Sequence, residues 1–479
     1  MSDNGRVQGS GFRVQRPDCP CGAALAVAAA LAGLAAWAPS LRAAELSEAE
    51  IIGQADARIE QHRKADVVLR VLGEDGRPVA EGTRVRIEQT RHAFLFGSNI
   101  FLFGRAGDEK LDAEYQRRFA ELLNYATLGF YWWHYEPVRG RPRYADTERT
   151  LAWCLERHIT CKGHPLAWNW VDPRWLPQDP SEAMKLQLAR IGDCVGTFKG
   201  RIDYWDVVNE ATHFDREEPR RVAPILTKAI AEMGVPAYVQ SAFKAARQAN
   251  PEAVLIINDY RTDAEFEEKV LRKLVDADGR PLYDVIGIQS HQHGGAWSAK
   301  HTWEVAERFS KYGRPLHFTE TTLVSGALAR QRGPGPWEST PEGEKRQAEE
   351  VARFYTVLFS HPAVEAVTWW DFSDRGAWQG APAGFLRKDM SPKPAYDALK
   401  ALIKGRWWTK QEAVVGADGE VRFRGFLGAY RITVDRAPSP PDASRPLTGT
   451  FSVDKRARGP IEVRTGLDVP ATAPVRTRE

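Results

Sequence analysis

The sequence predicts an α/β fold, a closed (β/α)8 barrel with a small β-hairpin annex before it and a short β segment after it. Eight short apolar runs recur between residues 93 and 370, and a longer amphipathic stretch follows each of them. Strands and helices that alternate in this way form parallel sheets covered by helices. The length of 479 residues suits a barrel with accessory segments, and we place the barrel over residues 93–405.

A doubly wound open sheet is the alternative for alternating strands and helices, but it rarely needs eight regular repeats. No G-x-G-x-x-G motif opens the first helix and no G-x-x-x-x-G-K-[ST] motif occurs, so nucleotide binding is unsupported. The predicted strands are AFLFG from residue 93, NYATLGFY from 124, ITCKGHPL from 159, IDYWDVV from 202, AVLII from 253, DVIGI from 284, PLHFT from 315 and VEAVTWW from 364.

The first 44 residues are typical of an export signal. Three arginines precede an apolar run over residues 22–38, and small residues follow it up to Ala43 and Ala44. The run is shorter than the roughly 20 residues that a membrane-spanning helix needs. We therefore expect an exported protein, extracellular or periplasmic, with an uncleaved anchor as the alternative.

Between the signal and the barrel, residues 45–92 predict a helix followed by a β-hairpin. Residues 45–63 have helical spacing of their apolar groups. The stretch after them alternates apolar and polar residues on both sides of Asp75 and Gly76, a pair that favours a tight hairpin turn.

After the barrel, residues 406–434 predict a short β segment with two strands around Gly425 and Gly428. The remaining residues, 435–479, contain few large apolar groups and predict a disordered tail. The β elements on either side of the barrel could bind carbohydrate, although packing against the barrel is the simpler interpretation.

Five cysteines are present, and two of them lie in the export signal. Cys154, Cys161 and Cys194 remain, so at most one disulfide can form among them. A Cys154–Cys161 bridge suits an oxidising compartment, and three buried thiols are the alternative.

The charges are nearly balanced, with 66 Lys and Arg against 63 Asp and Glu and a net charge of +3. This balance argues against a nucleic-acid-binding protein that depends on phosphate contacts. The chain has 16 tryptophans, whose faces can stack on sugar rings. By composition alone, ordinary core packing is the better interpretation of these rings.

Catalytic groups of a barrel lie at the carboxyl ends of its strands. Two predicted strands end in a glutamate, Glu210 on the fourth and Glu320 on the seventh. One such glutamate more often pairs with an arginine or a helix end, but two of them with polar and aromatic neighbours favour catalysis. The neighbours at the strand ends are His164, Trp168, Asn209, Gln289, His291, Trp370 and Trp378.

Two carboxylates at one barrel mouth suit glycoside hydrolysis. One carboxyl donates a proton to the leaving oxygen, and the other attacks the anomeric carbon or activates water. We expect the fourth and seventh strands to face each other across the barrel. The carboxylates of Glu210 and Glu320 would then lie about 5–5.5 Å apart, the separation found in retaining enzymes.

Seven motifs follow one another in order within the roughly 310 residues of the predicted barrel: GHPLAW (163–168), WDVVNEA (205–211), NDY (258–260), IGIQSH (286–291), LHFTET (316–321), WWDFSDRGAW (369–378) and KPAYDAL (393–399). Each is similar to a motif of the family 10 glycoside hydrolases, the endo-β-1,4-xylanase family. A single match would be weak, but the complete ordered set is highly specific.

This resemblance implies a role for each matching residue. Glu210 would be the general acid/base and Glu320 the nucleophile of a retaining, endo-acting enzyme that cleaves β-1,4-xylosidic bonds. Asn209 would bond the 2-hydroxyl of the sugar, and His291 would support Glu320. We expect Glu320 to be ionised at rest and Glu210 protonated, since a negative neighbour favours the proton. The subsite of the attacked sugar would comprise His164, Trp168, Gln289, Trp370 and Trp378.

The second strand departs from the family pattern. Relatives carry Glu-Asn-x-x-Lys there, which binds the next sugar on the non-reducing side, whereas residues 128–137 read LGFYWWHYEP. Tyr131, Trp132 and Trp133 would replace polar grips by aromatic surface, unless some of these rings belong to the core. Asn169 stands where many relatives have His. Xylan is the leading substrate, with a decorated xylan, a mixed β-glucan or a short oligosaccharide as alternatives.

The chemistry requires no metal and no cofactor. The expected partner is a xylan-type polysaccharide, with no nucleic acid and no membrane beyond the export segment, and the expected state is a monomer. A non-catalytic carbohydrate-binding barrel and a transglycosylase are the alternative functions. The presence of both glutamates argues against a pure binding protein.

Overall fold

The computed structural model describes residues 46–435, 447–455 and 459–466 of the chain. The predicted export signal therefore lies outside the described residues. Across the described ranges, no helix is both long enough and apolar enough to cross a lipid bilayer.

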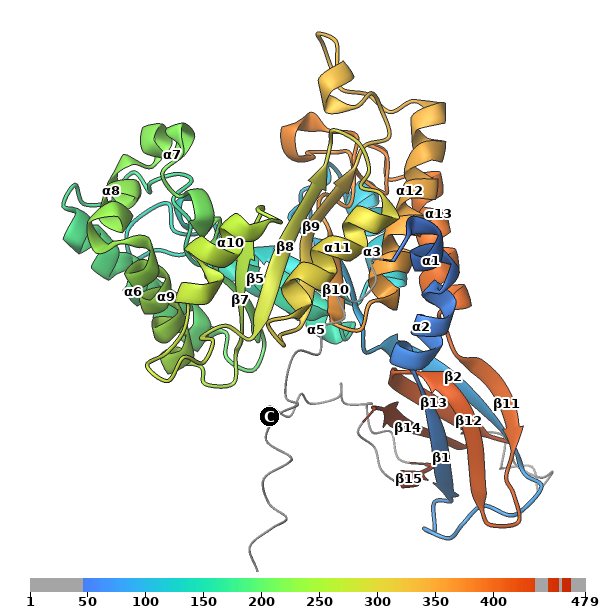
Figure 1. Ribbon diagram of the computed structural model, residues 1–479. Helices are drawn as coiled ribbons and strands as arrows, with labels where there is room; N and C mark the ends of the chain where they lie inside the picture. Colours follow the sequence, from blue (N-terminus) through green and yellow to red (C-terminus); the bar gives the residue numbers. More distant parts are fainter. Residues whose placement is uncertain (1–45, 436–446, 456–458, 467–479) are drawn as a thin grey trace, which may run out of the picture. The chain divides into compact units, whose positions relative to one another are not determined.

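Eight parallel strands close into a barrel within residues 46–435, which confirms the predicted (β/α)8 architecture (Figure 1). Successive strands are hydrogen-bonded neighbours, and the last strand closes the ring against the first. The barrel strands are β3 (Leu95–Asn99), β4 (Tyr125–Gly129), β5 (Thr160–His164), β6 (Tyr204–Asn209), β7 (Val254–Asp259), β8 (Val285–Gln292), β9 (Leu316–Leu323) and β10 (Val364–Trp369).

Helices cover the barrel because each presents one apolar stripe. In α9 (Val235–Ala249), for example, Tyr238, Val239, Ala242 and Ala246 are buried at helical spacing. The other helices are α3 (Glu109–Leu122), α4 (Trp132–Tyr135), α5 (Tyr144–Glu156), α6 (Pro180–Thr197), α7 (Glu217–Val222), α8 (Pro224–Met233), α10 (Ala264–Lys269), α11 (Ala299–Ser310), α12 (Pro341–Ser360) and α13 (Pro394–Ala401). Short helical turns are η1 (Ala211–His213), η2 (Leu271–Lys273), η3 (Ala329–Gln331), η4 (Trp378–Gly380) and η5 (Leu402–Arg406).

The helix predicted over residues 45–63 is two helices, α1 (Glu48–Gly53) and α2 (Ala55–Arg63). Helix α1 begins with a capping box, in which Ser47 accepts a hydrogen bond from the Glu50 backbone and the Glu50 side chain accepts one in return. The fully buried Ile51 then fixes this helix in an apolar cluster with Trp303 of α11.

Strands β6 and β9 do not face each other across the barrel, contrary to the sequence-based expectation. Strands β7 and β8 lie between them on one side of the ring and four strands lie between them on the other. The two strands that end in the predicted catalytic glutamates are therefore three places apart, so their carboxyl ends are closer than those of opposite strands.

Seven further strands of the described ranges form two sheets, ordered β12-β1-β15 and β11-β2-β13-β14. Each sheet combines one strand from before the barrel with strands from after it, so the segments before and after the barrel make one β module (Figure 1). The strands are β1 (Lys64–Leu72), β2 (Arg84–His92), β11 (Lys410–Val414), β12 (Glu420–Phe426), β13 (Gly428–Val434), β14 (Leu447–Val453) and β15 (Ile461–Arg464).

The predicted hairpin before the barrel is wrong. The turn itself is present, since the Gly73 amide donates to the Arg77 carbonyl at 2.8 Å and Gly76 has a φ of 76°. Strand β1, however, pairs with β12 and β15, whereas β2 pairs with β11 and β13. Each strand buries every second residue, and two such half-apolar faces are covered when the sheets stack on each other.

The prediction of a disordered tail is wrong for the part that the structure describes. Strand β14 pairs with β13, and β15 pairs with β1. Phe451, Val453 and Val463 are buried in the core of the β module. These few apolar residues sit at alternating positions on short strands, so the average composition of the segment hides them.

Cys154, Cys161 and Cys194 are buried free thiols, so the alternative without a disulfide holds. A hydrogen bond with Cys154, together with burial, raises the pKa of the Cys161 thiol. These thiols act as small apolar groups in the main core.

Gly163 on β5 is required by the packing of the barrel. A Cβ atom at this position would lie 2.2 Å from the ring of Trp205, which is fully buried on the neighbouring strand β6. The absence of a side chain at Gly163 therefore creates the space that the indole ring fills.

We expect Gly163→Ala to destabilise the protein by about 1–3 kcal/mol, because the new methyl group overpacks a rigid core. The matched control is Gly192→Ala in α6, where a Cβ atom would meet nothing within 4 Å. That substitution should stabilise the helix by about 0.5–1 kcal/mol. Urea unfolding of the two variants measures the difference, and equal midpoints would contradict the packing argument.

Candidate active site

The carboxyl ends of the barrel strands bring the predicted site residues together. Asn209 ends β6 and Glu210 follows it, while Glu320 lies within β9. His164 ends β5, and Gln289 and His291 lie within β8. Contacts among these residues join β5, β6, β8 and β9 at one end of the barrel.

Glu320 is buried, with 5% of its surface exposed, and both of its oxygens accept hydrogen bonds. Asn258 Nδ2 donates to Oε1 at 2.8 Å, and His291 Nε2 donates to Oε2 at 3.1 Å. Burial raises the pKa of Glu320, but the hydrogen bond from His291 and the charges of His164 and Lys162 outweigh it. The net effect lowers the pKa of Glu320 below its usual range, so the carboxylate is ionised.

His164 is held in place from behind by Asp206. Its Nδ1 donates to Asp206 Oδ2 at 2.7 Å, and its Nε2 lies 3.8 Å from Glu320 Oε1. Lys162 Nζ lies 2.7 Å from the same Asp206 oxygen, and neither side chain of this ion pair has any exposed surface. Burial raises the pKa of Asp206, but the interactions with Lys162 and His164 outweigh burial. The net effect lowers the pKa of Asp206 below its usual range. The ion pair thus supplies fixed charge directly behind His164.

Glu210 has a different environment. Its backbone is left-handed, with φ 58° and ψ 43°, a conformation that non-glycine residues adopt at a cost and that is concentrated at functional sites. Arg216 donates to its Oε2, and Gln289 Nε2 donates to its Oε1 at 3.2 Å. The Glu210 side chain retains 12% exposure, so it is more accessible to solvent than Glu320.

Amide side chains connect the two carboxylates. Asn209 Oδ1 accepts hydrogen bonds from Asn258 Nδ2 at 2.7 Å and from Gln289 Nε2 at 3.2 Å. Asn258 also reaches Glu320 and Gln289 also reaches Glu210. A continuous chain of hydrogen bonds therefore runs from one glutamate to the other and fixes their relative position.

Aromatic rings surround this polar centre. The Trp370 ring lies 5.2 Å from that of His164, and the Trp378 ring lies 4.6 Å from that of His291. Trp168 stacks on Trp170 at 4.7 Å, and its buried indole nitrogen has no hydrogen-bond partner in the described structure. Trp378 is 42% exposed, an unusual burial state for so large an apolar ring.

Trp378 is positioned by Asp371, which directly follows Trp370. The Trp378 backbone amide donates to Asp371 Oδ2 at 2.7 Å, and Asn99 Nδ2 contacts the other oxygen at 3.4 Å. Burial raises the pKa of Asp371 to about 6. Asp371 has a positive φ of 70°, so the chain turns sharply between the two tryptophans.

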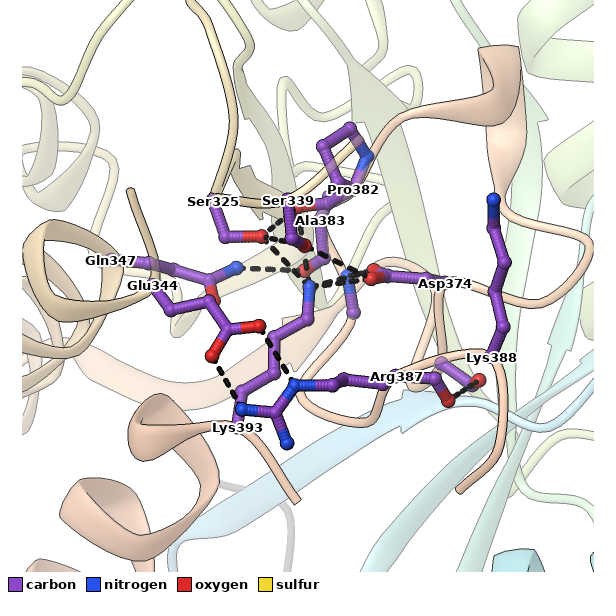
Figure 2. A network of polar contacts seen from close by, with 12 residues as sticks. Ser325, Ser339, Glu344, Gln347, Asp374, Pro382, Ala383, Arg387, Lys388 and Lys393 are labelled. Carbon is purple, nitrogen blue, oxygen red and sulfur yellow. Dashed lines mark hydrogen bonds and ion pairs between the residues drawn. The ribbon is translucent and has the colours of Figure 1, made fainter. Parts of the chain in front are cut away.

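A second buried ion pair fixes the segment that carries Trp378. Figure 2 shows the Lys393 side chain pointing at Asp374, and Nζ lies 2.7 Å from Oδ2. Lys393 also donates to Ser325 Oγ at 2.8 Å, which lies just after β9. Asp374 in turn accepts from the Gly384 amide at 2.8 Å. The segments that follow β9 and β10 are thereby tied to each other.

Sequence reasoning did not place five of these residues in the site: Lys162, Asp206, Asn258, Arg216 and Asp371. Four of them occur inside or beside motifs that the sequence shows, and Asp206 and Asn258 lie within WDVVNEA and NDY. Charged residues inside apolar strands are rarely buried without a partner, and this signal could have identified Lys162 and Asp206. Arg216 lies in a loop, where no periodicity identifies it.

The model of glycosyl hydrolase family 10 matches residues 99–402, more than half of the chain. The protein belongs to glycosyl hydrolase family 10. The match begins at the end of β3 and ends just after α13, so it includes both glutamates and their supporting residues.

Two relatives illustrate the sequence identity and the coverage of this family 10 chain. It is 28% identical over 355 residues to endo-1,4-beta-xylanase B of Thermotoga neapolitana, covering 71% of this chain and 92% of that protein. It is 27% identical over 393 residues to anti-sigma-I factor RsgI6 of Acetivibrio thermocellus, covering 80% of this chain. The latter match spans only 46% of the length of the relative.

Solved structures agree on the fold of family 10. Xylanase 10B from Thermotoga petrophila, crystallised with xylobiose, superposes with a TM-score of 0.54 at 24% identity, covering 66% of this chain and 95% of that one. A xylanase from Cellvibrio japonicus gives 0.55 at 20% identity, covering 65% and 98%. These identities are low, so the likeness concerns the barrel architecture.

His291→Phe should raise the pKa of Glu320, because the substitution removes the donor that most favours the ionised carboxylate. The matched control is His293→Phe, since the His293 ring lies 5.4 Å from that of Trp378 but makes no hydrogen bond to Glu320 in the described structure. Nuclear magnetic resonance titration of labelled glutamate carboxyls measures both variants. An unchanged Glu320 titration in His291→Phe would show that the hydrogen bond is not the controlling interaction.

Lys393→Met should destabilise the protein by about 3–5 kcal/mol, because it leaves the buried Asp374 carboxylate without its cation. Lys388→Met is the control in the same segment. Lys388 pairs with Glu338 at 3.0 Å, but both side chains are more than half exposed, so its loss should cost at most about 1 kcal/mol. Chemical denaturation compares the two, and similar losses would refute the structural role of the buried pair.

Proposed function

We propose that this chain is a retaining, endo-acting β-1,4-glycanase of the xylanase type. The observation that carries the proposal is the unequal environment of two neighbouring carboxyl groups. Glu320 is buried and surrounded by donors that keep it ionised. Glu210 is more open to solvent, and one of its two partners, Arg216, lies in a loop and can give way to a substrate. A carboxylate pair with divided roles is what glycoside hydrolysis requires.

In the first step, Glu320 attacks the anomeric carbon of the sugar that occupies the site. The carbon–oxygen bond to the leaving sugar breaks while Glu210 delivers its proton to that oxygen. In the second step, Glu210 takes a proton from water, and the oxygen of this water displaces Glu320 from the anomeric carbon. The product keeps the β configuration, and both carboxyls return to their starting states.

The contact between Arg216 and Glu210 affects both steps of this reaction. The Arg216 guanidinium donates to Glu210 Oε2, and a carboxylate oxygen that accepts in this way is what the second step uses as a base. For the first step the proton must occupy Glu210, and the entering leaving-group sugar must take the place of the arginine.

The second barrel strand supports altered recognition of the neighbouring sugar. Tyr131 and Trp133 are half-buried and lie against Trp168, with ring separations of 6.1 and 6.4 Å. Trp132 is only 5% exposed and packs with Leu176, so this ring belongs to the core. Two aromatic faces therefore remain for contact with the substrate, and they discriminate less between sugars than hydrogen-bonding groups do.

Asn169 has a structural role in this proposal. Its Nδ2 donates to the Phe214 carbonyl at 2.6 Å and to Thr227 Oγ1 at 2.8 Å, and the residue is 3% exposed. It fixes the loop after β6, which carries Arg216.

Glu320→Ala should reduce the release of reducing ends from xylan by at least about 10⁴-fold, because no other group can form the covalent bond to the sugar. Wild type should produce xylo-oligosaccharides of mixed length whose new ends are β-configured. Glu338→Ala, an exposed glutamate outside the site, serves as control and should retain full activity. Anomer-resolved NMR and chromatography follow the products.

Equal release by wild type and Glu320→Ala would reject the enzymatic function. Initial products with α configuration would reject the retaining mechanism while leaving the two carboxylates in the reaction. Activity on a mixed β-glucan without activity on xylan would keep the mechanism and change the substrate.

A further inference from the structure

A cavity of about 240 Å³ opens beside the candidate active site. Its floor is apolar and includes the buried side chains of Phe103, Leu128 and Tyr135. This volume is several times the roughly 30 Å³ that one water occupies and falls below the roughly 300–1,000 Å³ of sites for drug-sized ligands. The cavity therefore has room for one ring-sized group. Its rim carries the exposed residues Arg105, His134, Arg143 and Arg149.

Two aromatic residues separate this cavity from the active site. Tyr131 lines the cavity, and its ring lies 5.5 Å from the ring of His164. Phe101 also lines the cavity, and its ring lies 5.5 Å from that of Trp370. A group in the cavity is thus one aromatic ring away from the residues around Glu320, within reach of a branch on a bound polysaccharide.

The rim carries more positive than negative charge. Three arginines line the cavity, against one carboxylate, Asp146. Asp146 lies 3.9 Å from Arg105 and 3.5 Å from Arg149, so it is shared between these two guanidinium groups. Arg143 forms no ion pair with a carboxylate among the described residues, and its side chain contacts His134 instead. The unpaired guanidinium is the group that an anionic ligand would meet.

The contact with His134 leaves most of the hydrogen-bond donors of Arg143 free to bind a ligand. Arg143 Nη1 lies 3.4 Å from His134 Nε2, an arrangement in which the arginine donates and the imidazole accepts. Burial lowers the pKa of His134, and the charges of Arg143 and Arg105 lower it further. The imidazole is therefore neutral near pH 7, and four of the five guanidinium N–H groups of Arg143 remain for other acceptors.

We propose that this cavity binds a sugar branch that carries a carboxylate, a hexuronic acid attached to the main chain, with Arg143 as its principal anchor. A planar guanidinium binds a carboxylate through two parallel hydrogen bonds, and the apolar floor covers one face of the sugar ring. The inference rests on the proposed glycanase function and specifies its substrate as a uronic-acid-decorated β-glycan.

The test compares two substrates that differ only in charge: a xylo-oligosaccharide branched with glucuronic acid and the same compound after reduction of the carboxylate to an alcohol. Wild type should show a kcat/KM about tenfold or more higher on the charged substrate, and added salt should reduce this ratio. Arg143→Gln should bring the ratio close to one while the rate on unbranched xylo-oligosaccharide stays within about twofold. Arg141→Gln, an exposed arginine in the same loop that does not line the cavity, should leave the ratio unchanged.

Equal kcat/KM values of wild type on the charged and reduced substrates would overturn the inference while the proposed function stands. A loss of the ratio in Arg141→Gln as large as in Arg143→Gln would also overturn it, because general surface charge would then explain the preference. Calorimetry measures the affinity of the protein for the two branched compounds and distinguishes failure of the proposed function from failure of the cavity inference. Tighter, Arg143-dependent binding of the charged compound without hydrolysis of any xylan would support the cavity and reject the proposed function.

Discussion

A buried negative charge at Glu320 is the constraint on which the site depends. An ionised carboxylate away from water costs several kcal/mol unless hydrogen bonds and opposite charges replace the lost solvent. Here the replacement comes from strands β5, β7 and β8, which contribute His164, Asn258 and His291. Only a closed barrel places the ends of these strands around one point. The architecture and the charge therefore depend on each other, and the Lys162–Asp206 pair extends the same arrangement one layer deeper.

The two glutamates differ because their surroundings differ. Around Glu320 every donor belongs to a barrel strand, whereas Glu210 is held by Gln289 from a strand and by Arg216 from a loop. A strand-borne group keeps its place when substrate binds, while a loop-borne arginine can yield its place. This contrast between a fixed and an exchangeable partner is the basis on which we propose Glu320 as the nucleophile and Glu210 as the acid/base.

Around this centre, the structure uses buried ion pairs to fix loops and exposed charges to face the substrate. Lys393 and Asp374 hold the segment that carries Trp378 and are almost fully buried (Figure 2). The three arginines that line the cavity beside the second barrel strand are exposed, and only Arg105 and Arg149 pair with the single carboxylate there, Asp146. Buried pairs of this kind define one arrangement of the chain, whereas an exposed surplus of one charge attracts ligands of the opposite charge. The aromatic rings of Tyr131 and Phe101 lie between this cavity and the active site, where they contact His164 and Trp370.

The sequence by itself determined the eight strand–helix units, their order, and the pair Glu210 and Glu320, because apolar periodicity and strand-end position are local properties of the chain. Only the tertiary structure decided how the flanking strands pair, since alternation marks a half-buried strand without naming its partner. The supposed hairpin β1–β2 is divided between two sheets, and β14 and β15 complete them from the far end of the chain. Asn258 and Arg216 likewise became functional candidates only through contacts with residues 62 and 6 positions away. Long-range contacts of this kind leave no periodic pattern, and they decide which charges are paired, buried or left for a ligand.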